Sequence, residues 1–302
     1  MTESRERTTA RTLVNGAVRL VYDHAPGELT PVVLLHGGGQ NRHSWGALFR
    51  RLEGSGHEVV SMDLRGHGDS DWTLDGYRLV DYGTDVETLL RTIDRPSVIV
   101  GASMGGLAGL HAAARRPDLV AGLVLVDITT RPRNTGTDRI LDFMQAHAEG
   151  FEDIDHAVVA VGAYLSHRER PPDREGLSRN LRQGPDGRWR WHWDPRILDD
   201  SSQSSYDRDV LDAAARTLRM PVLLVRGEHS DVVSTEDIEH FCELVPQTTV
   251  AVVAGAHHMV AGDRNDAFAD VIAGYLDDEG LRDSAPAVAE HEKGVIHGVR
   301  RS

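Results

Sequence analysis

Short apolar runs alternate with amphipathic helical patterns along most of this 302-residue chain. The runs are rich in leucine and β-branched residues, and they cover residues 18–22, 32–36, 59–64, 97–102, 123–127, 222–227 and 249–253. Helical patterns cover residues 45–52, 79–93, 104–115, 235–244 and 267–276. Strands that are apolar on both faces and alternate with helices are typical of a mostly parallel sheet covered on both sides. The pattern therefore predicts an α/β fold with a doubly covered sheet.

One long segment interrupts this alternation. Residues 129–205 hold helical patterns at 140–147 and 154–165, and three of the five tryptophans, but no strand of the parallel type. Insertions of this size between core elements are typical of caps over active sites. We therefore expect a helical cap at 129–205, inserted after the strand that ends near Asp127. The expected core is then 12–128 with 206–280, flanked by flexible tails at 1–11 and 283–302.

Composition excludes several classes of protein. Asp and Glu total 47 against 33 for Lys and Arg, a formal net charge of −14. Such a chain repels phosphate backbones, so we expect no nucleic-acid partner. No apolar run approaches the roughly 18 residues of a membrane span, and the first eleven residues lack the apolar segment of a secretory signal. We therefore expect no membrane association and a cytoplasmic location.

Metal and disulfide sites are not indicated either. Cys242 is the only cysteine, which excludes an internal disulfide and an all-cysteine metal site. The sixteen histidines include no H-E-x-x-H pair. The glycine-rich runs lack the lysine of a phosphate-binding loop. The sequence thus predicts neither a metal nor a cofactor.

A glycine-flanked serine follows one of the predicted strands. Gly101, Ser103 and Gly105 form a G-x-S-x-G pattern between the apolar run 97–102 and the helical pattern 104–115. This strand–turn–helix context is the one that a nucleophile elbow requires. The free N–H groups at the start of the following helix can stabilise developing negative charge. Ser103 is therefore a candidate nucleophile.

Three further motifs accompany the elbow in a fixed order. They are His36-Gly37-Gly38-Gly39, the D-x-R-G-x-G-x-S loop at 63–70, and the pair His257-His258 followed by Asp263. With these motifs, about residues 12 to 280 resemble the α/β-hydrolase superfamily. The resemblance implies the α/β-hydrolase fold and a Ser–acid–His triad that needs no cofactor.

The resemblance also suggests the other two members of the triad. The family's base precedes an acidic residue by five positions, which favours His258 over the adjacent His257. The family's acid most often lies in the loop after the strand 222–227, which favours Asp231 over Glu228. Asp127 is the distant alternative, because some relatives take the acid from the end of that earlier strand.

The remaining predicted site residues concern the oxyanion and the substrate. By resemblance, the backbone N–H groups of Gly38 and Met104 form the oxyanion hole, and His36 and Gly37 beside it are predicted to bind substrate. Trp189, Trp191 and Trp193 alternate with polar residues, which would place them on one face of an extended segment. They are predicted to line the substrate pocket, and packing inside the cap is the alternative.

These residues predict a serine hydrolase that cleaves a carboxylic ester or lactone of a small to medium apolar substrate. Two alternatives use the same triad: carbon–carbon bond hydrolysis, and cofactor-free perhydrolysis of the haloperoxidase-like type. A non-hydrolytic cyclase or ligand-binding member is the third alternative, although a complete triad argues against it.

Overall fold

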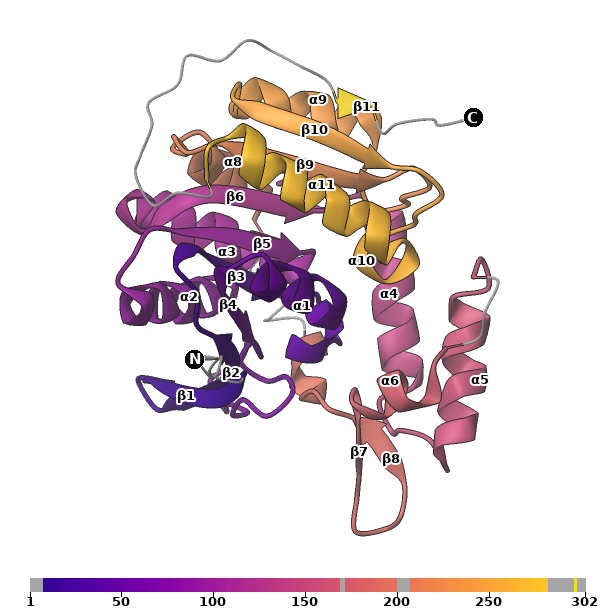
Figure 1. Ribbon diagram of the computed structural model, residues 1–302. Helices are drawn as coiled ribbons and strands as arrows, with labels where there is room; N and C mark the ends of the chain where they lie inside the picture. The colour runs from indigo at the N-terminus through magenta and orange to yellow at the C-terminus, as the bar shows by residue number, and fades with distance from the viewer. Residues whose placement is uncertain (1–7, 169–171, 200–206, 282–295, 298–302) are drawn as a thin grey trace.

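The computed structural model describes residues 8–168, 172–199, 207–281 and 296–297, which form an α/β core with helical segments beside it (Figure 1). Within these residues the core is one nine-stranded sheet in the order β1-β2-β4-β3-β5-β6-β9-β10-β11. Its strands are β1 (Thr9–Asn15), β2 (Val18–Ala25), β3 (Leu29–Leu35), β4 (His57–Met62), β5 (Ser97–Ala102), β6 (Val120–Val126), β9 (Val222–Gly227), β10 (Thr248–Val253) and β11 (Ile296–His297). The β1–β2 and β2–β4 pairs are antiparallel, and the other neighbours are parallel.

Helices cover both faces of the sheet, as the apolar strands require. Along β3, Val33 and Leu35 pack on one face while Val32 and Leu34 pack on the other. The first face is covered by α2 (Leu79–Ile93), α3 (Met104–Arg115), α8 (Arg208–Ala215) and α9 (Thr235–Leu244). The second is covered by α1 (Gly46–Gly54) and α11 (Asn265–Asp278). Because successive side chains point to opposite faces, each central strand contributes to two apolar cores.

The predicted α/β architecture is confirmed, but both ends of the chain depart from the expectation. Residues 9–11, expected in a flexible tail, belong to β1, where Thr9 pairs with His24. Only Leu13 of β1 is buried, so this edge strand has no apolar run that the sequence pattern could reveal. Residues 296–297, also expected in a tail, pair with β10 as β11. The rest of the two expected tails, apart from residue 8, lies outside the described residues.

Between β6 and β9 the chain leaves the sheet. This segment holds α4 (Asn134–Ala146), α5 (Ile154–Tyr164), α6 (Arg174–Ser178) and the antiparallel hairpin of β7 (Leu181–Gln183) and β8 (Trp189–Trp191). We call residues 129–199 the cap; residues 200–206 of the expected insertion lie outside the described residues. In Figure 1 the cap lies to one side of the sheet, with α4 approaching the short helix α10 (Val260–Asp263).

The chain just after β8 is tied to the core by backbone hydrogen bonds. The N–H of Gly68 donates to the carbonyl of His192 at 2.7 Å, and the N–H of Asp194 donates to the carbonyl of Gly66 at 2.8 Å. The buried Tyr77 hydroxyl donates to the Asp194 carboxylate at 2.6 Å. These bonds attach the cap to the loop that follows β4. Within the described segments, no helix has both the length and the apolar composition needed to cross a bilayer.

Candidate active site

Ser103 lies at the sharp turn between β5 and α3. Its backbone has φ +48° and ψ −117°, a combination that costs energy for any residue with a side chain. The Ser103 N–H donates to the carbonyl of Val126 at 3.1 Å, which ties the turn to the neighbouring strand. The strained geometry predicted for a nucleophile elbow is therefore present.

Two glycines make the turn possible. A Cβ on Gly101 would lie 2.5 Å from the carbonyl oxygen of Gly105, and a Cβ on Gly105 would lie 2.4 Å from that of Leu35. Real Cβ atoms do not approach backbone oxygens so closely, so both positions require glycine. The two glycines thus let the start of α3 pack directly against the ends of β3 and β5.

His258 is held by a carboxylate from the end of β6. Its Nδ1 lies 2.8 Å from Oδ2 of Asp127, whose side chain is completely buried. Asp127 adopts φ +50°, in the left-handed region that aspartate tolerates better than most residues. Oδ1 of Asp127 also accepts the Gly227 N–H at 3.0 Å, and Oδ2 accepts the Ser230 hydroxyl at 2.6 Å. These three hydrogen bonds hold both carboxylate oxygens of Asp127 in place.

Asp231, predicted as the partner of His258, does not contact it. Its carboxylate turns outward to Nη1 of Arg139 in α4, at 2.9 Å, and its side chain is 40% exposed. The prediction of Asp231 is therefore wrong in this structure, and the alternative, Asp127, occupies the position. Ser230, the residue before Asp231, is turned inward instead, and its hydroxyl donates to Oδ2 of Asp127 at 2.6 Å. Glu228, the other acidic residue of this loop, accepts the N–H of Gly255 at 2.8 Å.

The oxyanion loop, residues 36–39 after β3, carries three glycine N–H groups that differ in their hydrogen-bond partners. The Gly37 N–H donates to Oε1 of Gln40 at 3.1 Å, and the Gly39 N–H donates to Nε2 of His67 at 3.3 Å. Among the described residues, the N–H groups of Gly38 and Met104 have no hydrogen-bond partner. Met104 is the first residue of α3, where the N–H has no acceptor within the helix. These two free donors are the ones the sequence predicted for an oxyanion hole.

His36 supports this loop and does not face the cavity. It is fully buried, and its Nε2 accepts the Leu64 N–H at 3.0 Å. Its Nδ1 therefore carries the proton and donates to the carbonyl of Gly37 at 2.8 Å. Burial lowers the pKa of His36 to about 4, so the ring is neutral at pH 7. The prediction that His36 contacts substrate is wrong, because both ring nitrogens are used inside the protein.

His67, in the loop that follows β4, also has a structural role. It is fully buried, its Nδ1 lies 3.1 Å from the carbonyl of Arg65, and its ring meets that of His36 edge to face at 5.0 Å. Burial, together with the nearby His36, lowers the pKa of His67 to about 3. Two neutral imidazoles thus hold the oxyanion loop against the loop that follows β4.

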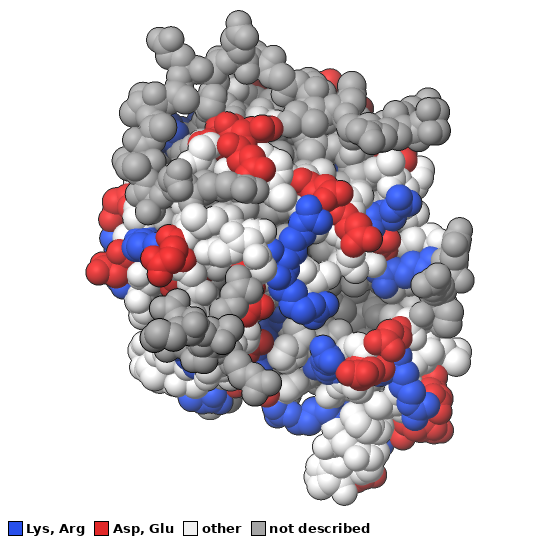
Figure 2. All heavy atoms as spheres, viewed as in Figure 1, with Lys and Arg blue, Asp and Glu red and all other residues white. Residues whose placement is uncertain are grey.

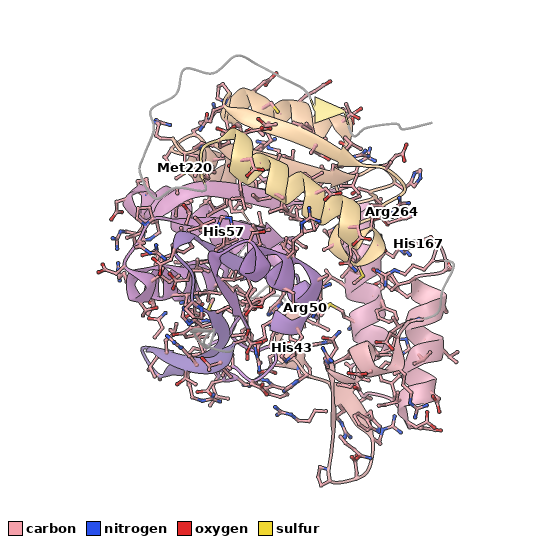
Figure 3. All side chains as sticks on the ribbon, viewed as in Figure 1. His43, Arg50, His57, His167, Met220 and Arg264 are labelled. Atoms are coloured by element: carbon pink, nitrogen blue, oxygen red, sulfur yellow. The ribbon has the colours of Figure 1, made fainter. Side chains whose placement is uncertain are left out.

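His257, the neighbour of His258, points toward the cap. Its ring stacks on that of His167 at 3.8 Å, and its N–H donates to Oδ2 of Asp263 at 2.9 Å. His167, labelled in Figure 3, lies beside the end of α10. Burial, followed by the nearby His167, lowers the pKa of His257. His257 therefore lies where the cap meets the core, whereas His258 faces Asp127.

Ser103 and His258 line one cavity of about 800 Å³, with Gly37, Gly38 and Met104 beside them. This volume lies in the range of pockets for small molecules. The described residues show no hydrogen bond between the Ser103 hydroxyl and His258, a bond that is often long before substrate binds. The rest of the wall is mainly apolar and comes largely from the cap, with Leu107 of α3 and Leu211 of α8. The apolar cap residues on it include Ile140, Phe143, Met144, Leu165, Leu177, Trp191 and Trp193.

The three tryptophans divide between the cavity and the interior of the cap. Trp191 and Trp193 line the cavity, and Trp193 is also buried against the core. Trp189 does not line it: its N–H and carbonyl pair with the backbone of Phe151, and its ring packs on the small apolar cluster of the cap. The prediction for Trp189 is wrong because the hairpin of β7 and β8 carries this end of the strand away from the core.

The described residues hold no cluster of histidine, cysteine and acidic side chains arranged to bind a metal ion. On the face shown in Figure 2, basic and acidic side chains are interspersed, with apolar and uncharged surface between them. This face therefore has no broad basic surface of the kind that nucleic-acid binding requires.

Comparisons with known proteins agree with this geometry. A family model for the alpha/beta hydrolase fold matches residues 30–264. Esterase Rv0045c of Mycobacterium tuberculosis is 31% identical over 263 residues, which cover 83% of this chain and 84% of that protein. The 2-(acetamidomethylene)succinate hydrolase of Mesorhizobium japonicum is 34% identical over 206 residues, which cover 67% of this chain and 72% of that protein.

Solved structures give the same result. The crystal structure of E-2-(acetamidomethylene)succinate hydrolase superposes with a TM-score of 0.80 at 26% identity, covering 90% of this chain and 100% of that one. A structure of the M. tuberculosis esterase Rv0045c gives a TM-score of 0.71 at 27% identity, covering 89% and 92%. The shared architecture therefore extends over nearly the whole chain.

Proposed function

Because this chain belongs to the α/β-hydrolase family, we propose that it is a serine hydrolase that cleaves a carboxylic ester or lactone through an acyl-enzyme. The observation that carries the proposal is one cavity holding a strained Ser103, two free oxyanion donors and His258 paired with a buried Asp127. The relatives named as esterases and hydrolases support hydrolysis as the general reaction.

In the proposed mechanism, Nε2 of His258 takes the proton of Ser103 as Oγ attacks the acyl carbon. Asp127 holds Nδ1 and stabilises the imidazolium that forms. The N–H groups of Gly38 and Met104 donate to the oxyanion, a contribution worth about 10²–10³ in rate for each donor. His258 then protonates the departing alkoxide, and afterwards activates the water that releases the acid from Ser103.

The cavity favours a small to medium apolar substrate. Most of its wall is apolar, and two of the three arginines on it have carboxylate partners: Arg168 pairs with Asp263 at 2.8 Å and Arg179 with Glu175 at 2.8 Å. Neither is free to bind a substrate carboxylate without losing that pair.

A panel of substrates tests the proposal. We expect p-nitrophenyl esters with short to medium acyl chains and simple lactones to be hydrolysed. The value of kcat/KM should fall for long chains that exceed the cavity of about 800 Å³. The Ser103→Ala variant is the control and should lose turnover. Failure of every ester and lactone, with no covalent labelling of Ser103 by a fluorophosphonate, would contradict the proposal.

A further inference from the structure

Ser230 lies in the loop after β9 and makes three hydrogen bonds through one hydroxyl group. It accepts the N–H groups of Val232 at 3.1 Å and Val233 at 3.0 Å. It lies 2.6 Å from Oδ2 of Asp127. A serine hydroxyl has one proton and two lone pairs. Because both lone pairs are used by backbone donors, the proton must go to Asp127.

The Asp127 carboxylate is held at both oxygens. Oδ1 accepts the Gly227 N–H at 3.0 Å, and Oδ2 is shared by Ser230 at 2.6 Å and His258 at 2.8 Å. Gly227 ends β9 and Ser230 lies in the loop that follows, so the end of this strand and its loop together fix the rotation of the carboxylate about its Cβ–Cγ bond. Without the Ser230 hydroxyl, His258 would be the only side-chain donor left on Oδ2 among the described residues.

We infer that Ser230 is a positioning residue, which orients the Asp127 carboxylate toward His258 and takes up part of its negative charge. The inference rests on the proposed function. In this loop the hydroxyl of Ser230 faces inward and the carboxylate of Asp231 faces Arg139. The family most often takes its acid from the loop after β9. Here that loop instead supplies the neutral hydroxyl of Ser230, which donates to Asp127 at the end of the neighbouring strand β6.

The two parts of this role have separate consequences. Without the hydroxyl, the Asp127 carboxylate can rotate more freely, and His258 is oriented toward Ser103 in a smaller fraction of molecules. Because only oriented His258 can accept the Ser103 proton, kcat should fall. The carboxylate also keeps more of its negative charge on Oδ2, which favours the protonated form of His258. Because protonated His258 cannot act as the base, the acid limb of the rate profile should move to higher pH.

The test compares Ser230→Ala with two other variants on p-nitrophenyl butyrate, from pH 4.5 to 9. In Ser230→Ala we expect kcat to fall about tenfold, the equivalent of one hydrogen bond to a charged group, with little change in KM. The acid limb of kcat/KM should rise by about half a pH unit to one unit. Ser230→Thr keeps the hydroxyl and should restore both the rate and the limb.

Ser234→Ala is the matched control. Ser234 caps α9 by accepting the Asp237 N–H at 3.1 Å, and it makes no contact with Asp127 or His258 among the described residues. This variant should lower thermal stability and leave the pH profile in place. If Ser230→Ala does not fold, Ser230→Cys keeps the side-chain size with a weaker donor and should move the limb in the same direction.

An acid limb and a kcat that stay at wild-type values in Ser230→Ala, or in Ser230→Cys if that variant replaces it, would overturn the role of Ser230 and leave the proposed function standing. Failure of Ser230→Thr to restore the limb would also overturn it. A wild-type protein that neither hydrolyses the ester nor reacts with a fluorophosphonate would overturn the proposed function itself.

Discussion

The change of Asp127 to Asn tests whether Asp127 is the acid of the triad. Its effect can be derived from the hydrogen bonds that Asp127 makes. Asparagine tolerates the φ of +50° that Asp127 adopts, so the backbone can stay in place. The Gly227 N–H donates to Oδ1, and this donor should hold the amide oxygen of the new residue at that position. The amide nitrogen then falls where Oδ2 now meets His258 and Ser230.

This placement reverses the polarity of the contact with His258. The amide N–H₂ would donate to Nδ1, which forces the ring proton onto Nε2. An imidazole protonated at Nε2 cannot accept the proton of Ser103. In a serine protease the same change costs about 10⁴ in kcat, equivalent to about 5.5 kcal/mol of transition-state stabilisation. We expect a loss of that size for Asp127→Asn, measured as kcat on p-nitrophenyl butyrate at pH 8.

Asp231→Asn is the matched control, because it makes the same chemical change in the neighbouring loop. It breaks the ion pair with Arg139, in which both side chains are at least 40% exposed. Exposed pairs contribute about 0–1 kcal/mol, so kcat should stay within a few fold of the wild type. Near-normal activity of Asp127→Asn together with a dead Asp231→Asn would refute the assignment of the acid.

Two further predictions concern the histidines. His258→Ala should abolish ester hydrolysis, whereas His257→Ala, which removes a ring stacked on His167, should keep a substantial fraction of the wild-type kcat; the opposite order would show that His257 is the base. The pKa values of His36 and His67, lowered to about 4 and about 3, predict that the free energy of unfolding decreases as the pH falls below about 6.5. As the pH falls, the unfolded chain takes up these protons before the folded chain does. Each histidine should therefore lower the free energy of unfolding by about 1.4 kcal/mol per pH unit, down to its folded pKa. Urea unfolding at pH 7.5 and pH 5 measures this; equal stability of the wild type at the two pH values, or no smaller fall in His67→Gln, would contradict it.

The fold could be predicted because its determinants are local. Continuous apolar runs mark strands buried on both faces, and three helices, α2, α3 and α9, have the predicted bounds. The strand missed at the start of the chain, β1, buries little apolar surface and depends on its pairing with β2. The missed helix α8 is short, and the bonds that its cap residue Asp207 makes became visible only in the structure.

The site was predicted where a motif fixes the backbone, and missed where tertiary packing selects a side chain. Ser103, Gly38 and Met104 follow from the turns that their glycines permit, and they share a cavity with His258. Asp127 and Asp231 both follow parallel strands that are neighbours in the sheet, so position along the chain cannot separate them. What distinguishes Asp127 is its positive φ and its hydrogen bond from the Ser230 hydroxyl. Both depend on contacts across the sheet.

The same reasoning explains the error at His36. The motif placed this residue beside the oxyanion loop, but a motif does not show to which side the ring turns. Its two hydrogen bonds, from the Leu64 N–H and to the Gly37 carbonyl, join two loops that are far apart in the sequence. Only the folded chain brings those partners together.

Covalent labelling measures whether Ser103 is a nucleophile that His258 and Asp127 activate. A fluorophosphonate should add one equivalent to the wild-type protein, and peptide mapping should place the adduct on Ser103. The labelling rate should fall by orders of magnitude in His258→Ala and Asp127→Asn and stay near the wild-type value in Asp231→Asn. No adduct on Ser103, or equal labelling rates in all four proteins, would contradict the account.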